Sequence, residues 1–324
     1  MDQARHHITF HDLQPEAGSF LGDVLAGLSS PQKTLSPKYF YDARGCELFD
    51  AICGLPEYYP TRTEMAMMQA HASEMAKHLG PDSLLIEYGS GTSHKTRVLI
   101  AALRPAVYVP IDIAGGQLRA SATQLAGVFP ELKIIAVCAD YSRQLTVPEI
   151  GNMAAHRRVI YFPGSTIGNF TVPEAREFLR KARALAGAEG AMLVGVDLKK
   201  DHALLHAAYN DAQGVTAEFN LNLLARINRE LGANFDLSAF RHHAFYNAAA
   251  GRIEMHLASL KAQRVTLGGH AFDFGPGETI HTENSYKYSI EEFRELAQSA
   301  GFEPAACWTD SQRLFAVHYL TVPR

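Results

Sequence analysis

The middle third of the chain alternates short, continuously apolar runs with segments whose apolar residues recur at helical spacing. Five such runs predict β-strands, at residues 84–89, 107–112, 134–140, 159–164 and 192–197. Strands that are apolar at almost every position are typical of a sheet buried on both faces. Because helical segments separate them, the pattern predicts parallel strands joined by right-handed crossovers. The core of the chain is therefore expected to be α/β.

The helix before the last of these strands has clear start signals. Thr171 is a suitable N-cap, Pro173 suits the first turn, and Glu174 complements the positive end of the helix dipole. An apolar stripe follows at helical spacing, which predicts an amphipathic helix packed on the sheet. The stripe consists of Phe178, Leu179, Ala182 and Leu185.

Two regions interrupt this alternation. Residues 1–61 are rich in aromatic and turn-forming residues, and residues 199–286 begin with a helix whose apolar residues recur at every fourth position. In the second region, a turn near residues 247–251 precedes a strand of alternating polarity at 252–257. We expect the two regions to form a second, smaller α+β domain or lid.

The C-terminal region resumes the sheet. An amphipathic helix is predicted at 290–300, with two antiparallel edge strands near 305–308 and 314–320. One domain is therefore expected from residues 62–198 and 287–324, and the other from residues 1–61 and 199–286.

Composition agrees with two domains and narrows the class of partner. The chain has 324 residues, of which 47% are hydrophobic and 20% charged, enough for a sizeable core. The formal net charge of −4 lowers the expectation of nucleic-acid binding. No apolar run approaches the roughly 20 residues of a membrane helix, and the N-terminus lacks a secretory pattern. We expect a cytoplasmic monomer that acts on a small molecule, without a nucleic-acid or membrane partner.

The cysteines and histidines contain no recognisable metal motif. His281-Thr282-Glu283 resembles the H-x-E segment of zinc deaminases, but its P-C-x-x-C partner is missing. His242 and His243 are adjacent, so on a strand they point to opposite faces. Four scattered cysteines without a C-x-x-C pair are typical of reduced thiols, and no bound metal is expected. These cysteines are Cys46, Cys53, Cys138 and Cys307.

A glycine-rich turn ends the first predicted strand and opens a helix. Its sequence is Glu87-Tyr88-Gly89-Ser90-Gly91-Thr92-Ser93. In doubly wound sheets, ligands bind beyond the carboxyl ends of the strands. Gly89 and Gly91 allow a positive φ and a close approach of the backbone to a ligand. A tight turn with a purely structural role is the alternative interpretation.

Acidic residues end the next two predicted strands. Asp112 lies where a carboxylate can accept hydrogen bonds from a ribose diol. Asp140 and the following Tyr141 are placed to meet the amino group and the ring face of an adenine. Together with the glycine turn, these residues predict a ligand that contains a nucleoside.

Three nucleotide ligands fit this spacing to different degrees. The dinucleotide fingerprint G-x-G-x-x-G fails because His94 replaces its third glycine. The P-loop pattern G-x-x-x-x-G-K-[ST] also fails at His94, but Lys95 and Thr96 match its last two positions. A P-loop-like ATP-binding module is therefore an alternative. Glu87 is unfavourable beside a polyphosphate and favours a cation, such as the sulfonium and amino group of S-adenosylmethionine (SAM). SAM is therefore the preferred ligand of this turn, and Ser90 is expected to be one of the residues that bind it.

An ordered series of motifs extends over nearly the whole chain. The N-terminal motifs are LSPKYFYD at 35–42, LPEYYPTR at 55–62 and the glycine turn continued through KTR at 95–97. The later motifs are GSTIGN at 164–169, GVDL at 195–198, YND at 209–211, RIEM at 252–255, TENS at 282–285 and WTD at 308–310. The series resembles the L-histidine N-alpha-methyltransferases of ergothioneine biosynthesis, which form hercynine (trimethylhistidine).

This resemblance implies a Rossmann-like, SAM-dependent methyltransferase sheet with a smaller substrate-binding domain, and L-histidine as the methyl acceptor. It implies that the methyl donor lies among Gly89, Lys95, Asp112, Asp140 and Tyr141. It further implies that the substrate meets Tyr58, Asn169, Tyr209, Glu283 and Ser285, with Tyr41, Gly164, Phe219 and Met255 nearby.

The residue types suggest individual roles within this set. The amide oxygen of Asn169 can accept a hydrogen bond from the substrate amine, and Tyr41 or a water can take the proton that the amine releases. Glu283 can accept a hydrogen bond from one ring N–H, while the Ser285 hydroxyl bonds the other ring nitrogen. Met255 then forms an apolar wall of the ring pocket.

Other interpretations of these residues stay open at this stage. Tyr58, Tyr209 and Met255 are also what a packed core would contain. A relative with the same fold that methylates another aromatic amino acid, such as tryptophan, is an alternative, although Glu283, Ser285 and Met255 argue against a bulky indole pocket. A catalytically inactive binding protein is a further alternative.

Overall fold

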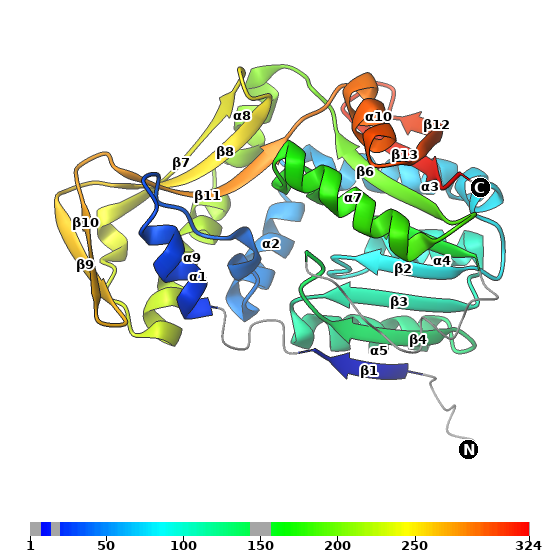
Figure 1. Cartoon of the computed structure of the whole chain (residues 1–324), viewed down its shortest axis with the longest axis horizontal. Coiled ribbons are helices and arrows are strands. Elements are labelled where there is room, and N and C mark those ends of the chain that lie inside the picture. Colours follow the sequence, from blue (N-terminus) through cyan, green and yellow to red (C-terminus); the bar gives the residue numbers. More distant parts are fainter. Residues whose placement is uncertain (1–7, 14–19, 143–156, 324) are drawn as a thin grey trace. The chain divides into compact units, whose positions relative to one another are not determined.

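The computed structural model describes residues 8–13, 20–142 and 157–323 and divides the chain into two compact units (Figure 1). The first unit comprises Met1–Pro15, Pro60–Lys199 and Lys287–Arg324, and the second comprises Glu16–Tyr59 and Lys200–Tyr286. Both units are thus assembled from segments that lie far apart in the sequence. Among the described helices, none has both the length and the apolar character needed to cross a membrane.

Within the described residues, the first unit is built on an eight-stranded sheet of order β1-β4-β3-β2-β5-β6-β13-β12. Strands β1 to β6 are parallel to one another, whereas β13 is antiparallel to both of its neighbours, β6 and β12. The strand order reverses between β2 and β5, which is where doubly wound sheets bind ligands. The strands are β1 (Ile8–Asp12), β2 (Leu84–Tyr88), β3 (Val107–Asp112), β4 (Lys133–Cys138), β5 (Arg158–Phe162), β6 (Ala191–Asp197), β12 (Glu303–Thr309) and β13 (Phe315–Thr321).

Helices cover both faces of this sheet. On one face, Met68 of α3, Leu99 of α4 and Leu125 of α5 join a buried cluster with strand residues such as Leu85 and Tyr108. Figure 1 shows α7 and α10 on the other face, where they pack against each other. The helices are α3 (Tyr59–Leu79), α4 (His94–Leu103), α5 (Gly115–Val128), the short η2 (Thr166–Asn169), α7 (Val172–Ala186) and α10 (Ile290–Ser299).

The structure confirms the α/β core, the five predicted central strands and the predicted C-terminal helix and strands. Every residue of β2, β3 and β6 is buried, as their apolar runs predicted. β4 and β5 end at Cys138 and Phe162, earlier than predicted, so Asp140 and Gly164 lie in the loops that follow them. α7 begins with the predicted cap, Thr171.

The first strand corrects the predicted domain division. β1 pairs with β4, with Ile8 opposite Ile134 and Asp12 opposite Cys138. Residues 8–13 therefore belong to the first unit, although residues 1–61 were expected as one block in the second. The pairing uses backbone groups of a sheet edge far away in the sequence, and such a partner leaves no local pattern.

The second unit combines a three-stranded antiparallel sheet, of order β11-β8-β7, with a hairpin and several helices. α9 packs against α2 and against β7 and β8. The helices are α1 (Phe20–Leu28), η1 (Pro37–Phe40), α2 (Ala43–Cys53), α8 (His202–Tyr209), α9 (Val215–Leu231) and η3 (Leu237–Ala239). The strands are β7 (Phe240–Asn247), β8 (Arg252–Ser259), β9 (Gln263–Leu267), β10 (His270–Phe274) and β11 (Thr279–Tyr286).

A buried ion pair ties together the two places where the chain leaves and re-enters the first unit. Lys287 Nζ lies 2.7 Å from Asp197 Oδ2, and both side chains are 1% exposed. A backbone bridge between Leu198 and Tyr288 lies beside this pair. A buried charge whose partner is removed is strongly destabilising, so the pair is expected to matter for the stability of the fold.

We predict that Lys287→Met lowers the free energy of unfolding by about 3–5 kcal/mol, because Asp197 stays buried without its partner. The matched control is Lys199→Met, which removes an exposed ion pair with Glu292 and should cost less than about 1 kcal/mol. Urea denaturation followed by fluorescence measures both variants. Equal losses in the two variants would show that the buried pair has no special role.

Candidate active site

The glycine turn after β2 adopts the backbone conformation that the sequence predicted. Gly89 and Gly91 have φ values of +69° and +47°. The position that a Cβ would take on Gly89 lies 3.8 Å from the Tyr141 ring, and no described atom lies within 4 Å of the equivalent position on Gly91. Within the described part of the chain, the buried Ser90 Oγ has no hydrogen-bond partner. The turn therefore offers open space and an unsatisfied polar atom at the reversal of strand order.

Asp112, at the end of β3, holds this turn in place. Its Oδ2 accepts a hydrogen bond of 2.9 Å from the Gly91 amide, and its Oδ1 accepts one of 2.9 Å from the Ala114 amide. Ser121 Oγ donates to the Gly91 carbonyl at 2.7 Å. Burial raises the pKa of Asp112, against the lowering effect of these amide bonds. Asp112 thus shapes the turn in addition to any contact with a ligand.

Glu87 differs from the role that the sequence suggested for it. Its side chain is buried and accepts hydrogen bonds from Thr96 Oγ1, at 2.6 Å, and from the Tyr108 hydroxyl. Burial raises the pKa of Glu87 to about 8, although both hydrogen bonds oppose the shift. At neutral pH the Glu87 carboxyl group is therefore mostly protonated. Glu87 supports the first turn of α4 and does not present a full negative charge to a ligand.

Asp140 and Tyr141 follow β4, at the same edge of the sheet as the glycine turn after β2. Asp140 Oδ1 accepts hydrogen bonds from the Ser142 amide at 3.0 Å and from its hydroxyl at 2.5 Å. The Tyr141 ring lies 5.5 Å from the Tyr88 ring and 5.7 Å from the Phe162 ring. The loop therefore supplies an ordered carboxylate and an aromatic face close to Gly89.

Sequence reasoning missed a buried carboxylate, Glu64, that joins two parts of this region. Glu64 is 0% exposed; its two oxygens lie 2.9 and 3.1 Å from the Gly164 amide, which donates to them. Lys95 forms an ion pair with the same carboxylate. Gly195 leaves room for it, because a Cβ there would lie 2.3 Å from Glu64 Oε1. Its position in the motif TRTE at 61–64, just past the motif that was recognised, was the available signal.

Gly164 and Asn169 flank the loop after β5 and belong to the first unit. Gly164 has a φ of +80° and Ser165 one of +58°, an uncommon conformation for a residue with a side chain. The Ser165 hydroxyl accepts a hydrogen bond of 2.8 Å from the Asp197 amide, which holds this conformation. Asn169 ends η2, directly before α7. The loop lies beside Lys95, whose Nζ is 3.7 Å from the position that a Cβ would take on Gly164.

The other expected substrate residues belong to the second unit, where aromatic rings form a connected cluster. Phe219 lies 6.0 Å from Tyr41, and Tyr58 lies 6.3 Å from Tyr209. Phe49 of α2 connects them, because its ring lies 5.7 Å from Tyr41 and 6.5 Å from Tyr58. Phe49 was not predicted as a site residue; its position, one residue after buried Leu48 in an amphipathic helix, was only a weak signal.

Hydroxyl groups at one end of this cluster are linked by a hydrogen bond. The Tyr209 hydroxyl donates to Ser285 Oγ at 2.7 Å, and both residues are buried. Burial raises the pKa of Tyr58 well above its ordinary value, and the nearby Tyr209 and Glu283 add to the shift. Tyr58 is therefore a neutral phenol at physiological pH. The structure brings Tyr58, Tyr209, Glu283 and Ser285 into one neighbourhood.

A β-bulge determines which way Glu283 faces. Glu283 lies opposite Met255 on β8, but His281 lies opposite His256, so the register shifts between them. The hydroxyl oxygen of the intervening Thr282 lies 3.0 Å from the Met255 carbonyl and 2.8 Å from Asn220 Oδ1, and both are acceptors for its single proton. Bulges redirect side chains and are frequent beside active sites. Glu283 therefore shares a face with Met255 and Ser285, away from His281.

Comparison with known proteins identifies the chain at the family level. Residues 20–322 match the family described as histidine-specific methyltransferase, SAM-dependent. The chain is 43% identical over 295 residues to the histidine N-alpha-methyltransferase of Mycolicibacterium smegmatis, an alignment that covers 89% of this chain and 90% of that protein.

Two fungal relatives are more distant. Ergothioneine biosynthesis protein 1 of Neurospora crassa is 31% identical over 88% of this chain and 32% of its own length. A 4-dimethylallyltryptophan N-methyltransferase of Aspergillus fumigatus is 30% identical over 88% of each chain. Because the family match extends over residues 20–322, this chain belongs to the histidine-specific, SAM-dependent methyltransferases.

Proposed function

We propose that this protein transfers methyl groups from SAM to the α-amine of L-histidine, three times in succession, and so forms hercynine for ergothioneine biosynthesis. The observation that carries the proposal is the 43% identity, over 89% of the chain, to a relative named for histidine N-alpha-methylation. SAM supplies a methyl group that its sulfonium has already activated. The protein's main task is then to hold the amine nitrogen in line with the carbon–sulfur bond.

Residues of the first unit fit the donor. No described atom lies within 4 Å of the position of a Cβ on Gly91, and the buried Ser90 hydroxyl is unsatisfied within the described residues. Asp112 and Asp140 would accept hydrogen bonds from the ribose and the adenine amino group. The Tyr141 ring would lie against the adenine, and Lys95 would meet the donor's carboxylate end. Glu87 then acts indirectly, by supporting the turn through Thr96.

Residues of the second unit suit an imidazole ring. Ser285 Oγ accepts the hydrogen bond from Tyr209, so its own proton is directed elsewhere and can be donated to an unprotonated ring nitrogen. Glu283 accepts a hydrogen bond from the ring N–H. Met255 lies opposite Glu283 in the strand register and is 2% exposed, which suits an apolar wall.

The reacting amine needs orientation and a route for its proton. Asn169 is proposed to accept a hydrogen bond from the amine, which directs the nitrogen lone pair at the methyl group. Tyr41, or a water, would accept the released proton. Tyr58 is unsuited to that role, because its pKa is raised and its phenol is difficult to ionise. Desolvation and the positive sulfonium both lower the pKa of the substrate ammonium, so a strong base is not required.

A second candidate substrate is another aromatic amino acid. A relative 30% identical to this chain is named as a 4-dimethylallyltryptophan N-methyltransferase, which favours considering indoles. An indole has only one ring nitrogen and would leave one of Glu283 and Ser285 without its partner, which is costly in a buried site. Histidine is therefore preferred. The ATP-binding alternative is wrong, because the family is SAM-dependent.

Several further expectations complete the proposal. The protein is expected to act in the cytoplasm, where its four cysteines would stay reduced. Methyl transfer from a sulfonium needs no metal, so the reaction should proceed in the presence of a chelator. The protein is expected to act as a monomer on small molecules, without a nucleic-acid partner.

The direct test is incubation of the purified protein with SAM and each aromatic amino acid, followed by mass spectrometry of the amino-acid product. We expect trimethylated histidine, with release of S-adenosylhomocysteine, and no methylated tryptophan. Methylation of tryptophan in preference to histidine would overturn the substrate assignment. Donor binding without any S-adenosylhomocysteine would indicate a binding protein instead of an enzyme.

We predict that Glu283→Ala raises the KM for histidine by about tenfold or more, because a ring N–H loses its buried acceptor. The KM for SAM should change little. Glu218→Ala is the matched control, since Glu218 is an exposed acid of the same unit. Steady-state kinetics with each substrate varied in turn measures both constants. An unchanged histidine KM would remove Glu283 from the ring-binding role.

We predict that Glu64→Gln raises the KM for SAM by about tenfold, because Lys95 and the Gly164 loop lose the charge that positions them. The histidine KM should change much less, which a general loss of folding would not produce. Lys95→Met should act through the same pair, so the double variant should be no worse than the more severe single one. Additive losses would mean that Glu64 and Lys95 act independently. Glu177→Gln, on the exposed face of α7, is the control.

A further inference from the structure

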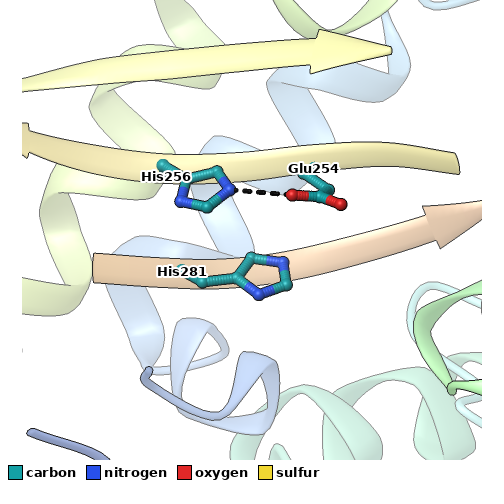
Figure 2. A group of neighbouring side chains, drawn as sticks. All are labelled: Glu254, His256 and His281. Carbon is teal, nitrogen blue, oxygen red and sulfur yellow. Dashed lines mark hydrogen bonds and ion pairs between the residues drawn. The ribbon is translucent and has the colours of Figure 1, made fainter. Parts of the chain in front are cut away.

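One face of strands β8 and β11 carries three side chains of types that bind metal ions (Figure 2). Glu254 and His256 are two residues apart on β8 and therefore point to the same face. His281 lies directly opposite His256 on β11. One ligand atom from each residue lies within 4.8 Å of the other two. Because of the bulge, this face is opposite to the one that carries Met255 and Glu283.

The Glu254 carboxylate is held so that one oxygen faces His256. Arg252 donates to Oε1 from Nε at 2.8 Å and from Nη2 at 2.7 Å, and Asn247 donates to the same oxygen at 2.9 Å. Oε2 lies 3.2 Å from His256 Nε2. Such support from a second layer of residues is typical of carboxylates that bind metals.

The imidazole of His256 is held from its other side. Its Nδ1 lies 3.2 Å from Thr279 Oγ1. In one tautomer Nε2–H donates to the Glu254 carboxylate and Nδ1 accepts from the Thr279 hydroxyl; in the other, Nδ1 donates to Thr279 and Nε2 turns a lone pair towards Glu254, which is the form that a cation between them would select. The Nε2–Oε2 separation of 3.2 Å corresponds to two ligands about 2.1 Å from a shared ion, at an angle of about 100°. That angle lies between octahedral and tetrahedral geometry.

Further ligand atoms lie on the same face. The His281 ring is nearly parallel to the His256 ring, with 4.6 Å between their centroids and 13° between their planes. Its Nε2 lies 3.1 Å from the Glu283 carbonyl oxygen. Asn284 lies opposite Glu254 in the register, and its side chain interacts with the His281 ring. The Asn284 amide oxygen therefore lies within reach of His281 as a further oxygen ligand.

We propose that Glu254, His256 and His281 form a binding site for a divalent transition-metal ion of the Zn²⁺ class. Two imidazoles and a carboxylate suit Zn²⁺ better than Ca²⁺ or Mg²⁺. Asn284 Oδ1 or a water completes the coordination. The His281 ring must approach the other two ligands and exchange its contact with the Glu283 carbonyl for the ion. A bound ion would join β8 to β11 and stabilise the second unit.

This site is missed when ligands are sought along the sequence. The H-x-E segment at His281 suggested Glu283 as a partner, and the missing cysteines then argued against any metal. In the structure His281 pairs with residues of another strand. The inference does not depend on the proposed function, because none of the proposed metal ligands is a residue proposed to bind SAM or histidine.

The test is isothermal titration of ZnCl₂ into the full-length, untagged protein, after removal of metals and in the absence of histidine, which itself binds zinc. We expect one equivalent bound and a rise in Tm of several degrees on saturation. Glu254→Gln and His256→Gln should each weaken binding by about tenfold or more. His270→Asn, which removes an exposed histidine of β10 in the same unit, should leave binding unchanged.

A measurement on the unaltered protein guards against variants that fail to fold. Crystals grown with ZnCl₂ should show an anomalous difference peak between Glu254, His256 and His281. Three results would each overturn the proposal. They are no saturable zinc binding by the wild type, wild-type zinc affinity in both site variants when these are folded, and a zinc peak that appears only elsewhere.

Discussion

The buried carboxylate of Glu64 is the interaction on which the arrangement of the first unit most depends. It accepts hydrogen bonds from the Gly164 amide after β5 and pairs with Lys95 in the first turn of α4. A fully buried charge is tolerated only when it is both paired and hydrogen-bonded. Satisfying Glu64 therefore fixes α3, α4 and the loop after β5 relative to one another. Gly195 is needed for this arrangement, because a side chain there would collide with the Glu64 carboxylate.

Glu87, although equally buried, meets the same constraint in the opposite way. It has hydroxyl partners, Thr96 and Tyr108, in place of a direct ion pair, and its pKa rises to about 8. The region around the glycine turn is thus less negative at neutral pH than its sequence suggests. The family match supports SAM as the ligand, whereas the burial of Glu87 does not favour the full negative charge from which the sequence argument inferred a cation.

Much of the fold and part of the site follow from local patterns. The apolar runs predicted the five central strands, and the Thr171 cap predicted the start of α7. What the sequence could not provide depends on contacts between distant residues. The pairing of β1 with β4, the partners of Glu64 and the place of Phe49 in the aromatic cluster all arise from chain segments that meet only after folding. The protonation of Glu87 likewise depends on burial, which residue spacing does not reveal.

The bulge in β11 shows how one residue separates two kinds of chemistry. In a regular strand His281 and Glu283 would share a face, because side chains repeat every second position. The register shift at Thr282 instead sets His281 beside His256 and Glu283 beside Met255. Asn220 of α9 stabilises this arrangement, since it accepts from Thr282 and donates to the His256 carbonyl. One backbone irregularity thereby separates the face on which we propose that the imidazole ring binds from the face proposed for a metal ion.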